Sequence, residues 1–161
     1  DGIECYDNLK KIDNASIDTC TLFHSFEHIN DPFNFLINIK KKIIKGGLII
    51  IEVPHARDIL LNDFNEYHFK KFSLWSQHLI LHTRKSIYSF LNKAGFNEIY
   101  ITGIQRYPLS NHLHWLVNKK QGGHKNPLSI IDTDGLTTEY EKSLSKIDAT
   151  DTLLLIAKNS F

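Results

Sequence analysis

Two histidines and a glutamate lie close together in the segment LFHSFEHINDP, residues 22–32, directly after an apolar stretch. His24, Glu27 and His28 stand where this strand-like run gives way to Asn-Asp-Pro, a sequence typical of a helix start. An imidazole titrates near neutral pH, so it can take a proton from a hydroxyl or carbon acid at an active site. The alternative is that Glu27 and His28 only hydrogen-bond the turn and cap the next helix.

Further histidines follow later apolar runs. His55 comes just after LIIIEVP, residues 48–54, and is either a second imidazole at the same site or part of a polar loop exit, where Arg57 could bind an anion. His78 and His82 are four residues apart in WSQHLILHT, which places them on one face if the segment is helical. We expect His82 to be a solvated or capping residue.

The segment QRYPLSNHLHWLVNKKQGGHK, residues 105–125, is the most unusual of the chain. Aromatic platforms beside planar hydrogen-bonding groups suit a sugar ring or a nucleotide, and basic side chains there could bind a phosphate. An oligomer interface and ordinary packing are the alternatives, because Trp, Tyr and Arg are also enriched at interfaces. The candidate substrate-binding residues are Arg106, Tyr107, His112, His114, Trp115 and His124.

Strands and helices that could position these residues alternate along the chain. Apolar and β-branched runs predict strands over 17–23, 48–53, 97–104 and 152–157, the second of them covered on both faces. Helical spacing predicts a helix from Pro32 to the Gly46-Gly47 pair, a second over 84–95 and a third over 136–147. Residues 55–82 read as a long loop with one helical piece, and 105–135 as a polar-aromatic excursion. This order specifies an α/β fold with a mainly parallel sheet, in a single domain over 1–161.

Composition excludes several classes of protein. The formal net charge of +1 requires neither nucleic acid nor anionic lipid as a partner. Cys5 and Cys20 form no CxxC pair, which favours a reducing, cytoplasmic location, and no apolar stretch is long enough to span a bilayer. The chain contains no methionine and opens on Asp-Gly before the strand-like IECY, so we expect the later part of a longer protein.

The order of these parts resembles the later half of class I S-adenosylmethionine-dependent methyltransferases. SIDTCTLFHSFEHINDP looks like that family's fourth strand and the following turn, KGGLIIIEVP like its fifth strand, and LHTRKSIYSFLNKAGF like the helix before its sixth. The resemblance implies a Rossmann-like methyltransferase sheet, mostly parallel with an antiparallel last strand. The chain has no G-x-G-x-G loop, so the N-terminal strands of such a sheet, with their cofactor-binding glycines, are missing.

What the resemblance implies for function is methyl transfer from S-adenosylmethionine to a small acceptor, with a sugar or sugar nucleotide of surface polysaccharide as the expected class. His24 and Ser25 would flank the adenosine-methionine side of the cofactor, and Cys5, Tyr6 and Asp7 would approach the adenine. His28, His55 and His78 are the candidate proton acceptors. The excursion at 105–135 would be an acceptor-binding insertion.

Two other functions stay open. Without the cofactor half, the chain could be a non-catalytic module for acceptor binding or homodimerisation. Some O-methyltransferases carry E-x-x-E-H at this place and hold magnesium with it, whereas this chain has H-x-x-E-H. His24, Glu27, His28 and His78 would suit zinc, manganese or iron better than magnesium, which prefers oxygen ligands.

Overall fold

A four-stranded sheet organises the molecule, in the order β1-β2-β4-β3. The structure is a computed structural model and describes residues 2–160. Its strands are β1 (Ile17–Phe23), β2 (Ile43–Pro54), β3 (Asn97–Ile104) and β4 (Thr152–Lys158). β1 pairs with β2 in parallel, and β4 is antiparallel to both of its neighbours. The predicted direction of the last strand is confirmed, and the carboxyl ends of β1, β2 and β3 meet at one edge of the sheet.

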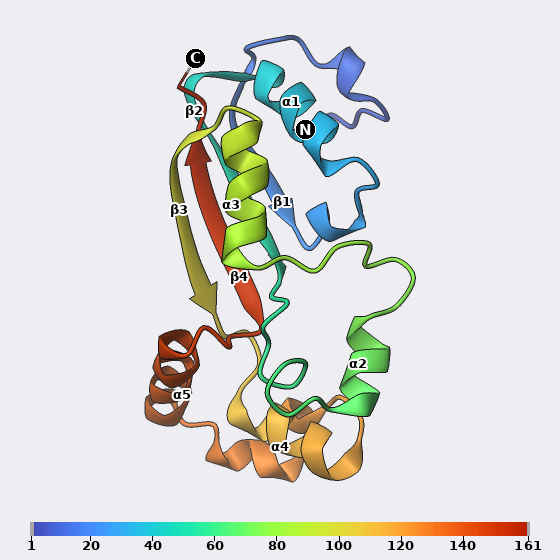
Figure 1. The fold of residues 1–161 in the computed structure, drawn as a ribbon, viewed down its shortest axis with the longest axis vertical. Helices are drawn as coiled ribbons and strands as arrows, with labels where there is room; N and C mark the ends of the chain where they lie inside the picture. Colours follow the sequence, from blue (N-terminus) through green and yellow to red (C-terminus); the bar gives the residue numbers. More distant parts are fainter. Residues whose placement is uncertain (1, 161) are drawn as a thin grey trace.

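Two helices lie side by side on one face of this sheet, α1 (Pro32–Lys42) and α3 (Arg84–Lys93) (Figure 1). Both begin close to where the sequence predicts, each after a residue whose side chain caps it. The Asp31 carboxylate accepts a hydrogen bond from the Asn34 amide, and the Thr83 hydroxyl accepts one from the Ser86 amide. Each cap satisfies a backbone donor that the first helical turn leaves unpaired.

The apolar core lies between these helices and the sheet. Ile49 and Ile51 of β2 and Leu153 of β4 are fully buried, whereas Ile50 and Ile156 on the other face are only half-buried. The expectation that β2 is covered on both faces therefore holds for one face only, because α1 and α3 pack on the same side.

The start of β2 corrects a second expectation. α1 ends at Lys42, and the buried Ile43 already pairs with Ile17 of β1, so the Gly46-Gly47 pair lies inside the strand and does not end the helix. A Cβ on Gly47 would lie 2.7 Å from the carbonyl oxygen of Asp18. Glycine is needed there because the two backbones approach too closely for a side chain.

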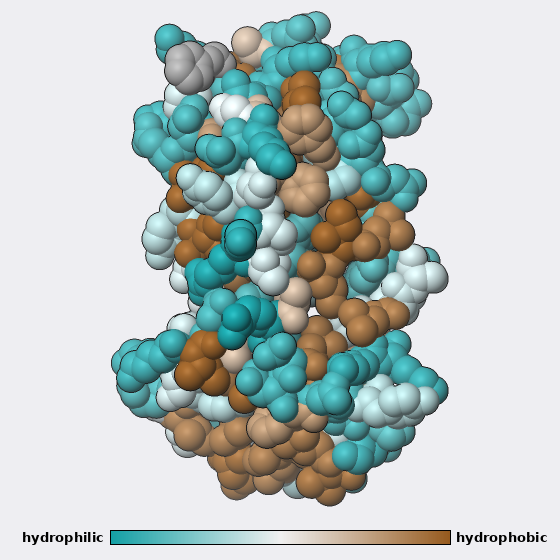
Figure 2. Space-filling view, viewed as in Figure 1, coloured by the Kyte–Doolittle hydropathy of each residue, from teal (hydrophilic) through white to brown (hydrophobic). Residues whose placement is uncertain are grey.

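The remaining elements gather beyond the carboxyl ends of the strands (Figure 1). They are α2 (Tyr67–Ser73), α4 (Leu109–Asn118) and α5 (Asp134–Lys146). α2 is the helical piece expected within 55–82, and α5 confirms the third predicted helix, but α4 lies in the segment that the sequence suggested was irregular. Apolar residues collect on the surface at this end of the molecule (Figure 2), and Val117 of α4 is 75% exposed.

The first residues form no strand, although IECY has a strand-like pattern. Residues 2–6 have no regular structure, Ile3 is 93% exposed, and a short 3-10 turn follows at Leu9–Lys11. No helix within residues 2–160 has the length and apolarity needed to cross a membrane.

Candidate functional site

A cavity of about 870 Å³ opens at the carboxyl ends of the parallel strands. His24 follows β1, His55 follows β2, and Arg106 and Tyr107 follow β3, so the sheet itself brings residues that are distant in sequence to one edge. α2, α4 and a turn around Gly122 form the opposite walls. Its further lining residues are Pro54, Asp58, Leu61, Phe69, Phe72, Ser73, Trp75, His78, Asn111, His112, Trp115, Gln121, His124, Lys125, Asp151 and Thr152.

Most of the residues singled out in the sequence meet in this cavity. They are His24, His55, His78, Arg106, Tyr107, His112, Trp115 and His124. His28 does not line it but contacts His78, with ring centroids 5.0 Å apart. Ser25 is half-buried beside His24, and His114 is buried outside the cavity, where its Nδ1 pairs with the side-chain amides of Asn118 and Asn126.

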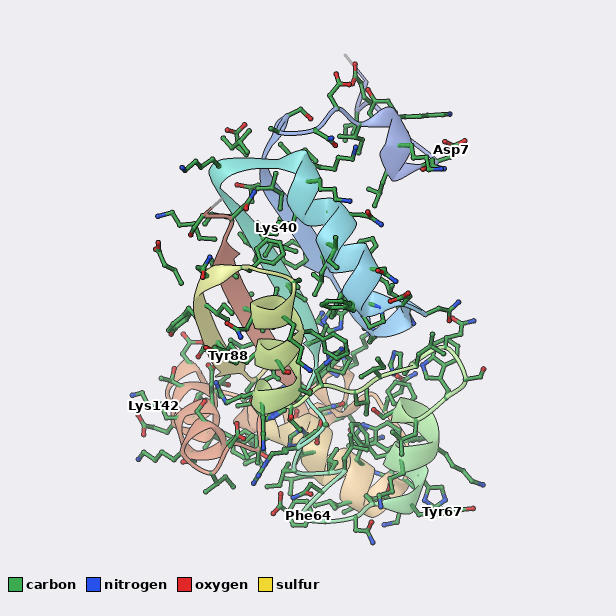
Figure 3. All side chains as sticks on the ribbon, turned by 45° about the horizontal axis from the view of Figure 1, so that its top comes forward. Asp7, Lys40, Phe64, Tyr67, Tyr88 and Lys142 are labelled. Atoms are coloured by element: carbon green, nitrogen blue, oxygen red, sulfur yellow. The ribbon has the colours of Figure 1, made fainter. Side chains whose placement is uncertain are left out.

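Cys5, Tyr6 and Asp7 are not brought to the cavity. All three are exposed, and Asp7 pairs with Lys11. Figure 3 shows Asp7 at the opposite end of the molecule from Phe64 and Tyr67, which lie at the cavity end. The predicted contact of these three residues with adenine stays a prediction.

His28, His78 and Glu27 form a cluster at the edge of the cavity. One potential ligand atom from each residue lies within 4.8 Å of the others. His28 donates from Nδ1 to the Gln77 carbonyl at 2.6 Å, and His78 donates from Nδ1 to the Ser73 carbonyl at 2.7 Å. These hydrogen bonds leave both Nε2 atoms with a free lone pair, because a neutral imidazole carries one proton.

The Glu27 carboxylate is the unusual member of this cluster. Its side chain is 1% exposed, and neither of its oxygens has a hydrogen-bond partner among the described residues. Burial alone raises the pKa of Glu27, but the neighbouring His24 and His28 lower it overall, so the carboxylate is ionised at neutral pH. His24 Nδ1 lies 3.7 Å and His28 Nε2 3.8 Å from its Oε1 atom.

His24 joins this cluster to the ends of the other strands. Its Nε2 lies 2.9 Å from the Glu52 carboxylate on β2, and the Arg106 guanidinium contacts both groups. The contact with Glu27 raises the pKa of His24, although burial and Arg106 oppose it. Because the Arg106 guanidinium pairs with the Glu52 carboxylate, the charge of Arg106 is partly compensated within the chain.

His55 and His112 are both buried and are both held by a hydrogen bond at Nδ1. His55 Nδ1 bonds the Thr150 carbonyl, and its buried Nε2 lies 3.8 Å from Asp148. His112 Nδ1 bonds the Tyr140 hydroxyl at 2.6 Å, while its Nε2 faces the Gln105 amide. Burial lowers the pKa of His55, and it lowers the pKa of His112 to about 4, so both rings are neutral at neutral pH.

Two cavity carboxylates were missed in the sequence. Asp151 accepts hydrogen bonds from the backbone amides of Arg106 and Tyr107 and from the Gln105 side chain, and so shapes the turn after β3. Asp58 is 3% exposed, and burial raises its pKa to about 7. The sequence offered one indication of Asp58: it ends the segment His55-Ala56-Arg57-Asp58, four residues beyond the end of a strand.

Comparison with known proteins agrees with this arrangement. A methyltransferase-domain family matches residues 4–101 of the chain. No curated protein sequence matches it significantly. Among solved structures, a SAM-dependent methyltransferase from Archaeoglobus fulgidus superposes with a TM-score of 0.57 at 16% identity, covering 93% of this chain and 62% of that one.

Two further structures give the same result. One is a SAM-dependent methyltransferase from Thermotoga maritima, described as a possible histamine N-methyltransferase, with a TM-score of 0.58 at 14% identity over 92% of this chain and 58% of that one. The other is phosphoethanolamine N-methyltransferase 2 of Haemonchus contortus, with a TM-score of 0.51 at 16% identity over 91% and 34%. This chain thus spans about three fifths of the length of the first two. It belongs to the methyltransferase-domain family and has the Rossmann-like fold of class I S-adenosylmethionine-dependent methyltransferases.

Proposed function

We propose that the chain carries out methyl transfer from S-adenosylmethionine to a small acceptor, a sugar or sugar nucleotide of surface polysaccharide, in the cytoplasm. The observation that supports this most is the cavity at the carboxyl ends of the strands, which is where open α/β sheets bind ligands. Its size falls within the range of roughly 300–1,000 Å³ typical of small-molecule sites. The free thiols of Cys5 and Cys20 support a reducing compartment.

The acceptor would lie against the walls contributed by residues 105–135, the proposed insertion. Tyr107 and Trp115 offer aromatic surfaces, Asn111 and His124 offer polar groups, and Lys125 offers a charge at the same cavity. Aromatic rings beside planar hydrogen-bonding groups suit a sugar ring or a base. His114 lies outside this wall, so its proposed contribution is to hold α4 and the following turn through Asn126.

The cofactor supplies an electrophilic methyl group when bound. His24 and Ser25, just after β1, are the residues of this chain that fit its methionine side, because His24 lines the cavity beside the carboxylates of Glu27 and Glu52, and Ser25 follows it. The remaining contacts that the family makes with a glycine-rich loop have no counterpart in this sequence. The site in this chain is therefore one wall of a cofactor site.

Among the candidate proton acceptors, His78 has the best geometry. It lines the cavity, its Nδ1 proton is held by the Ser73 carbonyl, and its Nε2 lone pair is free to accept a proton. His28 stands behind it with the same tautomer. His55 is fully buried and donates from Nδ1 to the Thr150 carbonyl, while its Nε2 has no hydrogen-bond partner among the described residues, so we assign it a positioning role.

Calorimetric titration with S-adenosylhomocysteine tests the cofactor part of this proposal. We expect saturable binding by the wild-type chain and binding at least about tenfold weaker in His24→Ala, since a charge-assisted contact contributes roughly 1.5–3 kcal/mol. His68→Ala is the control, because His68 is half-exposed and lies outside the cavity. No heat of binding from folded wild-type protein would contradict a cofactor site in this chain.

A second candidate function is metal-dependent O-methyl transfer, favoured by the buried Glu27 carboxylate that no described residue hydrogen-bonds. One ring nitrogen each of His28 and His78 lies within 4.8 Å of the other and of a Glu27 oxygen, and each ring is fixed by a carbonyl, as metal-bound imidazoles usually are. Two imidazoles and one carboxylate suit zinc, manganese or iron(II). His24 lies outside this group of three: its Nε2 contacts Glu52, and its Nδ1 lies 3.7 Å from Glu27.

Elemental analysis of purified protein, followed by zinc titration, tests the metal. About one equivalent of metal in the wild type and its loss in Glu27→Gln would support the site. The control is Glu139→Gln, an exposed glutamate of α5. Equal zinc affinity of wild type, Glu27→Gln and Glu139→Gln would exclude a metal site at Glu27.

A non-catalytic role in acceptor binding or homodimerisation is the remaining alternative. The exposed apolar side chains of Val117, Leu128 and Ile130, at the end of the molecule where Figure 2 shows apolar residues gathering, support a self-association surface. Light scattering after size exclusion decides this: a dimer that Ile130→Asp converts to monomer supports the surface, and a wild-type monomer contradicts it.

A further inference from the structure

Asp58 is a buried carboxyl group that the proposed roles above leave unused. It is 3% exposed and lines the cavity, yet its side chain accepts a hydrogen bond only from the backbone near it, the Leu60 amide at 2.7 Å. No cation of the described residues acts on it. Asp151, the other cavity carboxylate, has three donors and a nearby arginine instead.

A second carboxylate adds to the cost that burial places on ionising Asp58. It is that of Asp151, just before β4. The neutral Tyr140 hydroxyl of α5, which His112 of α4 hydrogen-bonds, is the other titratable group nearby. Arg106 could have compensated the charge, but it is directed at Glu52 and His24. Burying a carboxylate charge is costly in general, and no described residue supplies a counter-ion for Asp58 beside the Leu60 amide.

The aromatic walls of the same cavity suit a cation. Phe69 and Phe72 of α2 pack against Trp115 of α4 with ring centroids 5.1 and 5.3 Å from it, and all three line the cavity with Trp75. Aromatic rings attract ammonium groups through their quadrupoles, and a carboxylate completes such a site. The raised pKa of Asp58 agrees with a carboxylate whose counter-ion arrives with the ligand.

We propose that Asp58 binds an ammonium group of the acceptor, so that the methylated atom is an amine nitrogen, as on an amino sugar. This inference rests on the proposed methyl transfer and names the nucleophile of the same site.

An ammonium ion has no lone pair, so a proton must leave before transfer. Asp58 takes that proton from R–NH₃⁺, giving R–NH₂ and a neutral carboxylic acid. The nitrogen lone pair then forms the bond to the methyl carbon, and the electron pair of the broken C–S bond stays on sulfur.

Tryptophan fluorescence offers a direct test, because the chain has two tryptophans, Trp75 and Trp115, and both line the cavity. The probes are choline and its uncharged isostere 3,3-dimethylbutanol, then UDP-glucosamine and UDP-glucose. We expect wild type to prefer the charged member of each pair by about tenfold or more, and Asp58→Asn to lose that preference. Choline keeps its charge at every pH, so its affinity should rise as the pH rises through about 7, and this rise should disappear in Asp58→Asn.

The control is Asp63→Asn, which removes an exposed carboxylate five residues away and should change nothing. Equal affinity for both members of each pair in wild type, or a preference that Asp58→Asn retains, would overturn the inference. Asn keeps an oxygen for the Leu60 amide, and if the variant nevertheless fails to fold, the pH dependence of choline binding to wild type decides alone. Binding of UDP-glucose equal to that of UDP-glucosamine would reject the amine but keep the sugar acceptor.

One further outcome concerns the cofactor, whose sulfonium is also a cation. Weaker binding of S-adenosylmethionine but unchanged binding of S-adenosylhomocysteine in Asp58→Asn would assign the carboxylate to the cofactor and overturn the inference. Failure of the proposed function is recognised separately, by S-adenosylhomocysteine not binding to wild type.

Discussion

His28 and His78, fifty residues apart in the chain, stand with ring centroids 5.0 Å apart and both donate Nδ1–H to a backbone carbonyl. One ring nitrogen of each lies within 4.8 Å of an oxygen of the buried Glu27 carboxylate. Packing of an apolar core does not require two histidines beside a buried carboxylate. Such an arrangement suits a general base or a metal site.

Removing the Glu27 charge should make metal-free protein less stable. Glu27 is buried, but His24 at 3.7 Å and His28 at 3.8 Å lower its pKa below the usual value, so the folded chain favours the ionised carboxylate. We expect Glu27→Gln to lower the free energy of unfolding by about 1 kcal/mol in the presence of a chelator. Urea denaturation measures this change, with Glu139→Gln as an exposed control. A more stable variant would show that the burial cost outweighs the two histidine contacts.

Gly47→Ala should destabilise the sheet strongly. Its Cβ would lie 2.7 Å from the Asp18 carbonyl oxygen and 2.6 Å from Cγ2 of Ile43, so β1 would have to move away from β2. We expect a loss of about 2 kcal/mol or more in the free energy of unfolding. Gly135→Ala on α5 is the matched control, since nothing lies within 4 Å of its Cβ and alanine favours a helix. Similar effects of the two changes would contradict the register of β1 on β2.

Most of the framework could be predicted because its signals are local. The caps at Asp31 and Thr83 and the β-branched run of β1 are each encoded within a few residues. α4 was missed because its buried face carries polar and aromatic side chains, such as Asn111, His112 and His114, in place of an aliphatic stripe.

Site residues were predicted less completely for a different reason. Histidines stand out in a sequence, whereas single carboxylates such as Glu52 and Asp58 look like ordinary solvated residues. Their importance comes from burial and from neighbours far along the chain: Glu52 meets Arg106, and Asp58 faces Asp151. Such contacts depend on how the strands assemble, which no local pattern contains.

Acid should destabilise the protein partly through His82. This ring is fully buried between Phe26 and Phe90, and burial lowers its pKa to about 4 from the usual 6.5. Below pH 6.5 the unfolded chain therefore binds a proton that the folded chain does not, and stability is lost progressively down to about pH 4.

We expect His82→Phe to make the fall in unfolding free energy between about pH 6.5 and 4 shallower than in wild type, with His68→Phe, on exposed α2, leaving the slope unchanged. Urea denaturation across this range measures both slopes, and taking differences cancels the opposite contribution of Asp58. An unchanged slope in His82→Phe would mean that water reaches the ring.

The central claim, that the methyl group is delivered into the cavity at the strand ends, can be tested with S-adenosylmethionine labelled with ¹³C in its methyl group. In a two-dimensional carbon–proton spectrum, we expect the bound methyl signal to move away from its free position, because Phe69, Trp75, Tyr107 and Trp115 line the cavity. Transferred Overhauser effects to an indole proton should accompany the shift and disappear in His24→Ala. A methyl signal that stays at the free position in the presence of excess folded protein would contradict the account.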